Sequence, residues 1–225
     1  EETRKSSSLL AAGKFVTTPE VSKESATVEI KTRIKNEINV YKQVNLITTI
    51  VDKNNKIVKT IETSQKISQN GEYEFIQRAE IKSPNLWSPD NPYLYKIYTE
   101  VKEGEKVIDD YETPSGIREF HFDADHGFFL NGKNTKIKGV CLHHDCGCLG
   151  AACHERAIER KIEILKKIGC NAIRTSHNPP APELLDYCDR YGLLVMDEAF
   201  DEWKKGKKEY GYHKYFEEWA NKDLK

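Results

Sequence analysis

Polar and ionisable side chains end or follow three short apolar segments of this 225-residue sequence, at 138–142, 172–174 and 193–196. These polar residues are His143, His144, Asp145, Arg174, Ser176, His177, Asn178, Asp197 and Glu198. Imidazole, guanidinium and carboxylate groups can hydrogen-bond a polar ligand and stabilise charge that develops on it. The grouping favours an enzyme that acts on a polar ligand. The alternative is that these loops are polar only because they are exposed to water.

Two predicted helices lie between the three apolar segments, so we expect these segments to be parallel strands. The first is predicted over 154–168, before Gly169 at the C-cap, and the second over 182–191, between Pro near its start and Gly192. Strand–helix alternation predicts βαβ units, in which the carboxyl ends of the strands meet. These ends form the active-site rim of a (β/α)8 barrel or the crevice of an open sheet. No G-x-G-x-x-G or P-loop follows any strand, which disfavours a nucleotide site.

The segment from Phe15 to about Thr113 alternates apolar and polar residues with period two and contains polar turns such as Asn70-Gly71. Several short strands at such intervals predict an antiparallel β-sandwich without helices. The predicted inward faces include two rows, one from Ala26 to Ile34 and another of Tyr73, Phe75, Ala79 and Ile81. Further along, Asn131-Gly132 predicts a hairpin between 128–130 and Ile137.

Composition indicates a soluble protein. Apolar residues make up 38% of the chain and charged residues 32%, and the net charge is −1, so neither nucleic acid nor an anionic membrane is an expected partner. No apolar run reaches the roughly 18 residues that span a bilayer. The start lacks an initiator Met and a signal sequence, and we expect residues 1–13 to be a linker or a cloning-derived segment. A cytoplasmic and a periplasmic location, of bacterial type, both remain open.

The six cysteines all lie after residue 140 and are expected to be free thiols. Four of them, Cys141, Cys146, Cys148 and Cys153, are interleaved with histidines, which raises zinc as an alternative. Their spacing lacks the C-x2-C knuckles of structural zinc sites, so thiols that fill small apolar positions are favoured.

Two groups of aromatic residues invite different interpretations. Trp87, Tyr93 and Tyr95 could stack against a sugar, but aromatic residues in sandwiches more often fill the core, which we favour. Trp203 is the better stacking candidate because it follows the third parallel strand.

Five segments in order and spacing resemble glycoside hydrolase family 2, in particular its β-galactosidase type. They are residues 13–20, 86–95, 127–133, 171–180 and 184–199. The resemblance implies a multidomain protein with an immunoglobulin-like all-β sandwich at 14–117. It also implies that residues 118–225 are the first βα units of a (β/α)8 TIM barrel, so that only the N-terminal part of the barrel is present. The family's sugar-binding jelly roll would precede Glu1, and its acid/base and nucleophile Glu would follow Lys225, so no catalytic carboxylate is expected here.

The resemblance also assigns roles to individual residues. His143 matches a histidine that contacts sugar hydroxyls, His177 one beside the glycone, and Arg174 the arginine that holds the nucleophile carboxylate. Asp197 matches an acid that supports the rim, and Glu202 lies where some members place a metal ligand, for Mg²⁺ or Na⁺ in the parent enzyme. No cofactor is otherwise required. The substrate-binding or supporting set is completed by His144, Asp145, Asn178 and Trp203. Cys141-Leu142 departs from the Asn-Arg of many relatives.

The resemblance implies a parent that is a retaining exo-β-glycosidase acting on terminal β-linked sugars, foremost a β-galactosidase. β-Glucuronidase and β-mannosidase remain open, as does a non-catalytic carbohydrate-binding or scaffold module. The chain alone is expected to be inactive. Its incomplete sheet, with Ile173, Val195 and Met196 underpacked, is expected either to self-associate or to be poorly ordered from Trp203 onward. The parent could itself be a homo-oligomer.

Overall fold

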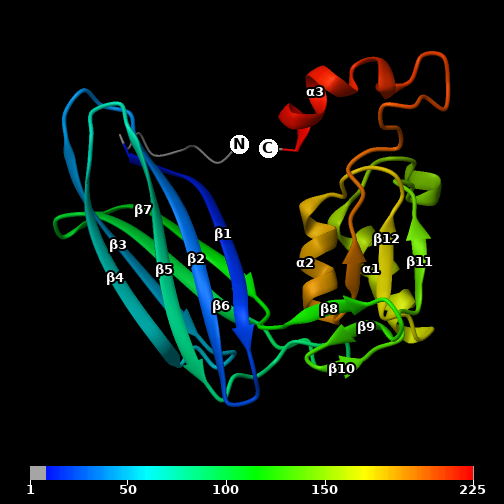
Figure 1. Ribbon diagram of the computed structural model, residues 1–225, viewed down its shortest axis with the longest axis horizontal. Helices are drawn as coiled ribbons and strands as arrows, with labels where there is room; N and C mark the ends of the chain where they lie inside the picture. The colour runs from blue at the N-terminus through cyan, green and yellow to red at the C-terminus, as the bar shows by residue number, and fades with distance from the viewer. Residues whose placement is uncertain (1–8, 225) are drawn as a thin grey trace. The chain divides into compact units, whose positions relative to one another are not determined.

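The computed structural model of the chain describes residues 9–224 and divides into two compact units between Thr135 and Lys136. The first unit is built from antiparallel strands and the second from parallel strands and helices. Figure 1 labels the elements of both. No helix among residues 9–224 is long and apolar enough to cross a membrane.

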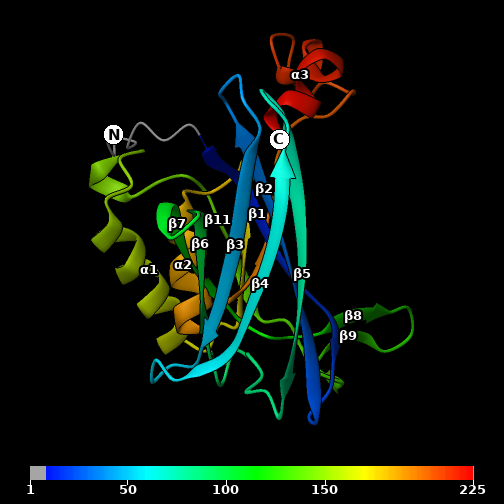
Figure 2. The same ribbon diagram turned by 90° about the vertical axis from the view of Figure 1, so that its left-hand side faces the viewer.

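The first unit contains two antiparallel sheets. One has the order β1-β2-β5, from β1 (Leu9–Val21), β2 (Ser25–Asn36) and β5 (Glu72–Lys82). The other has the order β4-β3-β6-β7, from β3 (Lys42–Val51), β4 (Ile57–Ile67), β6 (Tyr95–Glu103) and β7 (Lys106–Ser115). Figure 2 shows β3 and β4 running side by side. No helix falls between residues 14 and 113, as the period-two pattern predicts.

Alternate residues of these strands form the core of the sandwich. In β2 every second residue from Ala26 to Asn36 is buried, which confirms the predicted inward row. In β5 the buried residues are Phe75, Gln77, Ala79 and Ile81, whereas Tyr73, predicted to share that face, is exposed. Tyr73 lies near the end of β5, beyond the reach of the core.

A small hairpin sheet completes the first unit, in the order β10-β9-β8. It contains β8 (Phe120–Asp123), β9 (Gly127–Leu130) and β10 (Lys133–Asn134). Asn131 and Gly132 both have positive φ, 51° and 72°, which is the geometry of the predicted two-residue turn. Asn131 fixes the hairpin through its side chain, which accepts from Glu119 N and donates to the Trp87 carbonyl.

The second unit has a three-stranded parallel sheet with two helices packed on it. The strands are β11 (Gly139–Leu142), β12 (Ala172–Thr175) and β13 (Leu194–Met196), with β12 in the centre. The helices α1 (Glu155–Lys167) and α2 (Pro182–Tyr191) lie side by side in Figure 2. Shorter helices follow β11 and close the chain: η1 (Gly147–Leu149), η2 (Tyr212–Lys214) and α3 (Phe216–Asp223). The predicted strand–helix order is confirmed.

Three sequence-based expectations need correction. The first helix was predicted to reach residue 168, but α1 ends at Lys167, and Ile168 is its C-cap and is 68% exposed. Ile173 was expected to be underpacked but is buried beneath α1 and α2, whereas Met196 is exposed. β1 begins at Leu9, so the end of the predicted linker is strand, and residues 1–8 lie outside the described residues.

Candidate functional site

Arg174, His177 and Glu198 form a connected cluster where β12 and β13 end. The Arg174 guanidinium donates from Nε to Glu198 Oε1 at 2.6 Å, and its Nη2 forms an ion pair with the same oxygen at 2.5 Å. The His177 ring meets the other carboxylate oxygen, with 2.9 Å between Nδ1 and Oε2. One carboxylate therefore holds a cation and an imidazole in fixed positions.

The parallel register of β12 and β13 explains why these side chains meet. Arg174 is paired with Met196, so the residues just after each strand emerge at the same edge of the sheet. Thr175, buried at the end of β12, donates to Asp197 Oδ1 at 2.9 Å and accepts from Glu198 N at 2.9 Å. This hydroxyl orients the chain after β13, and through it the Glu198 carboxylate.

The charge state of Glu198 determines the tautomer of His177. Partial burial acts to raise the pKa of Glu198, but hydrogen bonds from Arg174 and His177 outweigh it and leave the pKa below its ordinary value. The carboxylate is thus ionised at neutral pH and can only accept hydrogen bonds, so His177 Nδ1 carries a proton. In a neutral ring Nε2 is then an acceptor, and its nearest ionic neighbour, Asp201 Oδ1, is 3.9 Å away.

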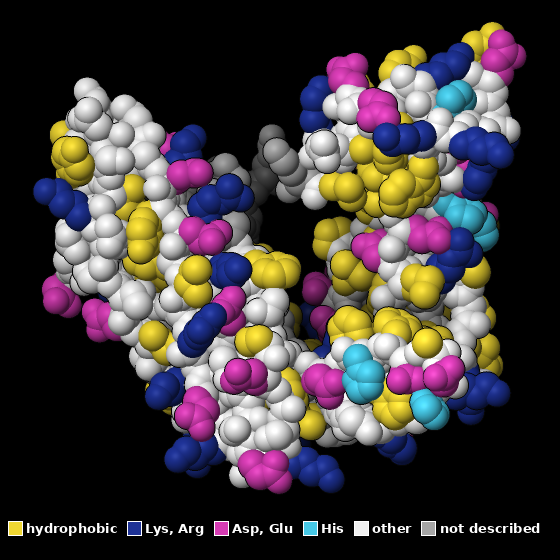
Figure 3. All heavy atoms as spheres, in the orientation of Figure 1, with side chains coloured by type: hydrophobic (Ala, Val, Ile, Leu, Met, Phe, Trp, Pro, Cys, Tyr) yellow, Lys and Arg dark blue, Asp and Glu magenta, His cyan; other side chains and the backbone are white. Residues whose placement is uncertain are grey.

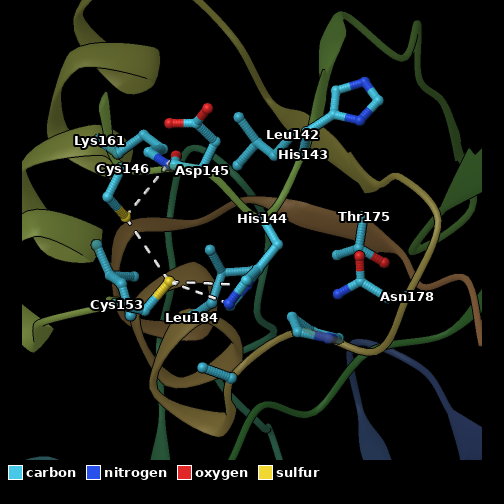
Figure 4. A pocket seen from close by; sticks show the side chains of 13 residues that line it. Leu142, His143, His144, Asp145, Cys146, Cys153, Lys161, Thr175, Asn178 and Leu184 are labelled. Carbon is cyan, nitrogen blue, oxygen red and sulfur yellow. Dashed lines mark hydrogen bonds between the residues drawn. The ribbon is translucent and has the colours of Figure 1, made fainter. Parts of the chain in front are cut away.

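The other predicted strand-end residues that follow the first and second parallel strands lie in two places. The His143 ring packs edge-on against His177, with ring centroids 5.6 Å apart. His144, Asp145 and Asn178 line a pocket together with His143, beneath the loop that follows β11 (Figure 4). The predicted strand-end residues are therefore divided between the Arg174–His177–Glu198 cluster and this pocket.

Glu202 and Trp203 lie apart from that cluster. Glu202 is 5% exposed and hydrogen-bonds His213 Nδ1 at 2.9 Å, which lowers the pKa of its carboxyl. A Cβ at Gly211 would fall 1.8 Å from Glu202 Oε2, so a larger residue there would displace the Glu202 carboxylate. Trp203 packs against Phe200 and Phe216, with ring centroids 6.2 and 5.6 Å apart. Its predicted stacking role remains a prediction.

The geometry around Glu202 does not favour the metal that the family resemblance suggested. Among residues 9–224 no group of three or more His, Cys, Asp or Glu side chains is placed to hold a metal ion. His213 already occupies one oxygen of the Glu202 carboxylate. We therefore derive no chemical step through a metal.

The aromatic residues of the sandwich are structural, as favoured from the sequence. Trp87 and Tyr95 are buried in the first unit, and the Arg118 guanidinium lies 4.6 Å from the centre of the Trp87 ring. Gly116 passes so close that an added Cβ would lie 2.8 Å from Trp87 atoms. Trp87 and Tyr95 are therefore core residues, and Tyr93 is partly buried.

Glu198 is a strand-end residue to which the sequence analysis assigned no role in the site. It stands beside Asp197, and the family resemblance gave the supporting role to Asp197 alone. Asp197 instead bonds Thr175, while Glu198 reaches Arg174 and His177. The only signal in the sequence was its position at the end of the third apolar segment.

Charged side chains of both signs are interspersed on the face shown in Figure 3. That distribution agrees with a net charge of −1 and provides no extended basic surface on this face for nucleic acid.

Comparisons with known proteins agree with the fold. Residues 13–118 match the family model of glycosyl hydrolases family 2, and residues 124–221 match the TIM barrel domain of that family. Beta-galactosidase BoGH2A of Bacteroides ovatus is 49% identical over 212 residues, which are 94% of this chain and 25% of that protein. A putative beta-glucuronidase of Formosa agariphila is 39% identical over 94% of this chain and 20% of its own length. A crystal structure of a family 2 member from Bacteroides cellulosilyticus superposes with a TM-score of 0.91 at 45% identity, over 96% of this chain and 28% of that one.

A β-sandwich followed by the opening strands of a TIM barrel, with polar residues at the strand ends, defines the class as glycoside hydrolase. The chain belongs to glycosyl hydrolases family 2. Its first unit contains the immunoglobulin-like sandwich and its second the start of the barrel. It spans about a quarter of the length of the curated relatives it matches.

Proposed function

We propose that the protein of which this chain is part is a retaining exo-β-glycosidase, specifically a β-galactosidase. The observation that carries the proposal is the Arg174–Glu198–His177 cluster at the barrel rim. The similarity to a protein named beta-galactosidase supports the choice of sugar. The chain supplies part of the sugar-binding rim. The two carboxylates of double displacement, about 5 Å apart in retaining enzymes, would come from the rest of the barrel.

His177 is proposed to bind the sugar through Nε2. Because Glu198 fixes the Nδ1 proton, a neutral His177 accepts a hydrogen bond from a sugar hydroxyl rather than donating one. A bond of this kind that tightens towards the oxocarbenium-like transition state lowers the barrier more than it tightens ground-state binding. The edge-on contact of His143 would hold the His177 ring in its orientation.

Arg174 is proposed to provide a fixed positive charge next to the catalytic centre. Glu198 holds the guanidinium by a hydrogen bond to Nε and an ion pair with Nη2, and Nη1 also reaches Cys141 Sγ at 3.4 Å. A guanidinium beside a nucleophilic carboxylate keeps that carboxylate ionised. This supports the role implied by the family resemblance, with Glu198 as the group that positions Arg174.

A β-glucuronidase is the second candidate, because relatives of that name are 39% identical in sequence and 33% identical among solved structures. A uronic acid carries a carboxylate and requires a free cation. In this cluster Arg174 already pairs with Glu198, so its guanidinium is not left free to pair with a uronate carboxylate. That pairing favours a neutral sugar such as galactose.

Kinetics of the full-length protein on nitrophenyl β-D-glycosides test the choice of sugar. We expect the β-galactoside to have the highest kcat/KM, above the β-glucuronide and the β-mannoside. A higher kcat/KM for the β-glucuronide would favour the second candidate, a β-glucuronidase. Sugar binding without turnover of any glycoside would favour the non-catalytic module instead.

The role of His177 is tested by His177→Ala in the full-length protein. A hydrogen bond strengthened in the transition state is worth about 2–4 kcal/mol, so kcat/KM should fall roughly 30–1000-fold. His121→Ala is the matched control, because His121 is exposed in the first unit and pairs with Glu119. A loss below about threefold for His177→Ala, or a loss explained by a collapsed melting temperature, would contradict the role.

A further inference from the structure

Two cysteine thiols face each other in the loop between β11 and α1. Cys146 Sγ and Cys153 Sγ are 3.7 Å apart, and both residues are partly buried (Figure 4). They line the same pocket as His144 and Asp145. This proximity brings together two nucleophilic groups that the proposed glycosidase chemistry does not use.

The backbone of the loop holds the two cysteines together. Cys146 N donates to the Gly150 carbonyl at 2.8 Å, and Gly150 N donates to the Gly147 carbonyl at 2.9 Å. Gly147 and Gly150 have φ of 63° and 59°, in the left-handed region that glycine adopts without steric cost. These two turns reverse the chain after Cys146, and this reversal brings Cys153 back beside Cys146.

An ammonium group and an imidazole flank the two thiols. Lys161 Nζ lies 3.9 Å from Cys146 Sγ and is anchored at 2.6 Å to the Asp145 carbonyl. The His144 ring nitrogens lie 3.7 and 3.8 Å from Cys153 Sγ. A neighbouring cation stabilises a thiolate, and an imidazole can accept the proton of a thiol. The pair is therefore surrounded by the groups that thiol–disulfide exchange requires.

We propose that Cys146 and Cys153 are a redox-active pair that forms a reversible disulfide with a low-molecular-weight disulfide as oxidant. The Cys146 thiolate attacks one sulfur of the oxidant RSSR, forms a mixed disulfide and releases one RS⁻. Cys153 loses its proton to His144 and attacks Cys146 Sγ, forming the internal S–S bond and releasing the second RS⁻. The two thiols are oxidised, the oxidant is reduced to two RSH, and the two protons pass to those products.

The geometry requires only a small movement. A disulfide bond is about 2.05 Å long, so the two sulfurs must approach by roughly 1.7 Å from their observed separation. The other thiols have different surroundings. Cys188 is buried in the second unit, which raises the pKa of its thiol to about 12. Cys141 instead meets the Arg174 guanidinium, whose hydrogen bond lowers the pKa of that thiol.

The disulfide would close a ring that begins at Cys146, directly after the segment from His143 to Asp145. Oxidation would thus restrain the segment that carries predicted sugar-binding residues. The inference goes beyond the proposed glycosidase function and does not depend on it, since the thiol pairing can be measured without any substrate.

The test uses the full-length protein in its native state, treated with oxidised glutathione and then alkylated with N-ethylmaleimide. Mass spectrometry of digests should find Cys146 linked to Cys153 and both lost as alkylation sites, with full recovery after dithiothreitol. Cys146→Ser and Cys153→Ser should each abolish the link and leave a glutathione adduct on the remaining cysteine. Cys148→Ser is the matched control from the same loop and should leave the link unchanged.

Three results would overturn the proposal. One is a link from either cysteine to Cys148, and another is persistent alkylation of both thiols after oxidation. The third is a stable glutathione adduct on Cys146 in the unmodified sequence, which would show that Cys153 cannot reach it. The wild-type measurement decides each case even if a serine variant fails to fold.

Discussion

Each unit of the chain contains a network of polar side chains, and the two networks are completed in different ways. In the sandwich, Gln77 is 2% exposed, accepts from Thr48 Oγ1 at 2.6 Å and donates to the Leu46 carbonyl and Thr63 Oγ1. Its amide is fully used by the protein itself. In the second unit, Glu198 satisfies one nitrogen of His177 and leaves Nε2 open, with Asp201 Oδ1 3.9 Å away.

This difference separates a structural network from a ligand-binding one. A closed, neutral network in a core has no atom left for a ligand and serves to fix one packing arrangement. A charged, partly exposed network with an open ring nitrogen retains a hydrogen bond for a substrate. Both networks consist of polar side chains, so the open atom, rather than polarity, identifies the site.

The largest expected effect concerns the core of the first unit. Trp87→Ala should lower the free energy of unfolding of the sandwich by about 3–5 kcal/mol, because it removes a buried ring that packs against Gly116 and Arg118. Urea denaturation measures this. Trp219→Ala, at an exposed tryptophan of α3, should cost less than about 1 kcal/mol. Equal costs for the two variants would mean that the sandwich core is not packed as described.

A pair of threonine substitutions sharpens the comparison of the two networks. Thr175→Val removes the hydroxyl that bonds Asp197 and Glu198, and Thr48→Val removes the hydroxyl that bonds Gln77. Each leaves a polar partner unsatisfied, at a cost of about 1–3 kcal/mol in the free energy of unfolding. Only Thr175→Val should also lower kcat/KM of the full-length protein. Equal activity losses would show that both networks act through stability alone.

The smallest expected effect is the contribution of Glu198 to stability against acid. Its folded pKa is lowered, so its stabilising contribution is present above the unfolded pKa of about 4.3 and is lost as pH falls through the folded value. Glu198→Gln should therefore make the melting temperature of the second unit less dependent on pH in acid. Glu29→Gln is the counterpart in the sandwich, where a hydrogen bond from Arg78 lowers the pKa of Glu29. A Glu198 variant with unchanged pH dependence would contradict the described contacts.

The fold could be predicted from the sequence wherever periodicity and end signals agree. Period two over β2 and the pair Gly169 and Gly192 after the helices indicated the elements closely. The predicted domain boundaries at 117 and 118 remain predictions. Local patterns could not show that α1 stops short of Ile168, because helix ends depend on the chain that follows.

The candidate site was predicted in composition but not in connectivity. The sequence placed Arg174, His177 and Asp197 at adjacent strand ends, since parallel strands share an edge. It did not indicate which of two neighbouring acids reaches Arg174, because that depends on where β13 ends and on the Thr175 hydroxyl. Side-chain direction after a strand is a tertiary property that spacing alone does not encode.

The Asn131 turn has a consequence for the chemical ageing of the protein. An asparagine before glycine deamidates when the next backbone nitrogen attacks its side-chain carbonyl carbon, with loss of ammonia. Asn131 is held by hydrogen bonds to Glu119 N and the Trp87 carbonyl, which oppose that attack, whereas Asn70, before Gly71, is exposed. Asn70 should thus deamidate first in the folded protein. The slower deamidation of Asn131 would then report how often the hairpin that holds it opens.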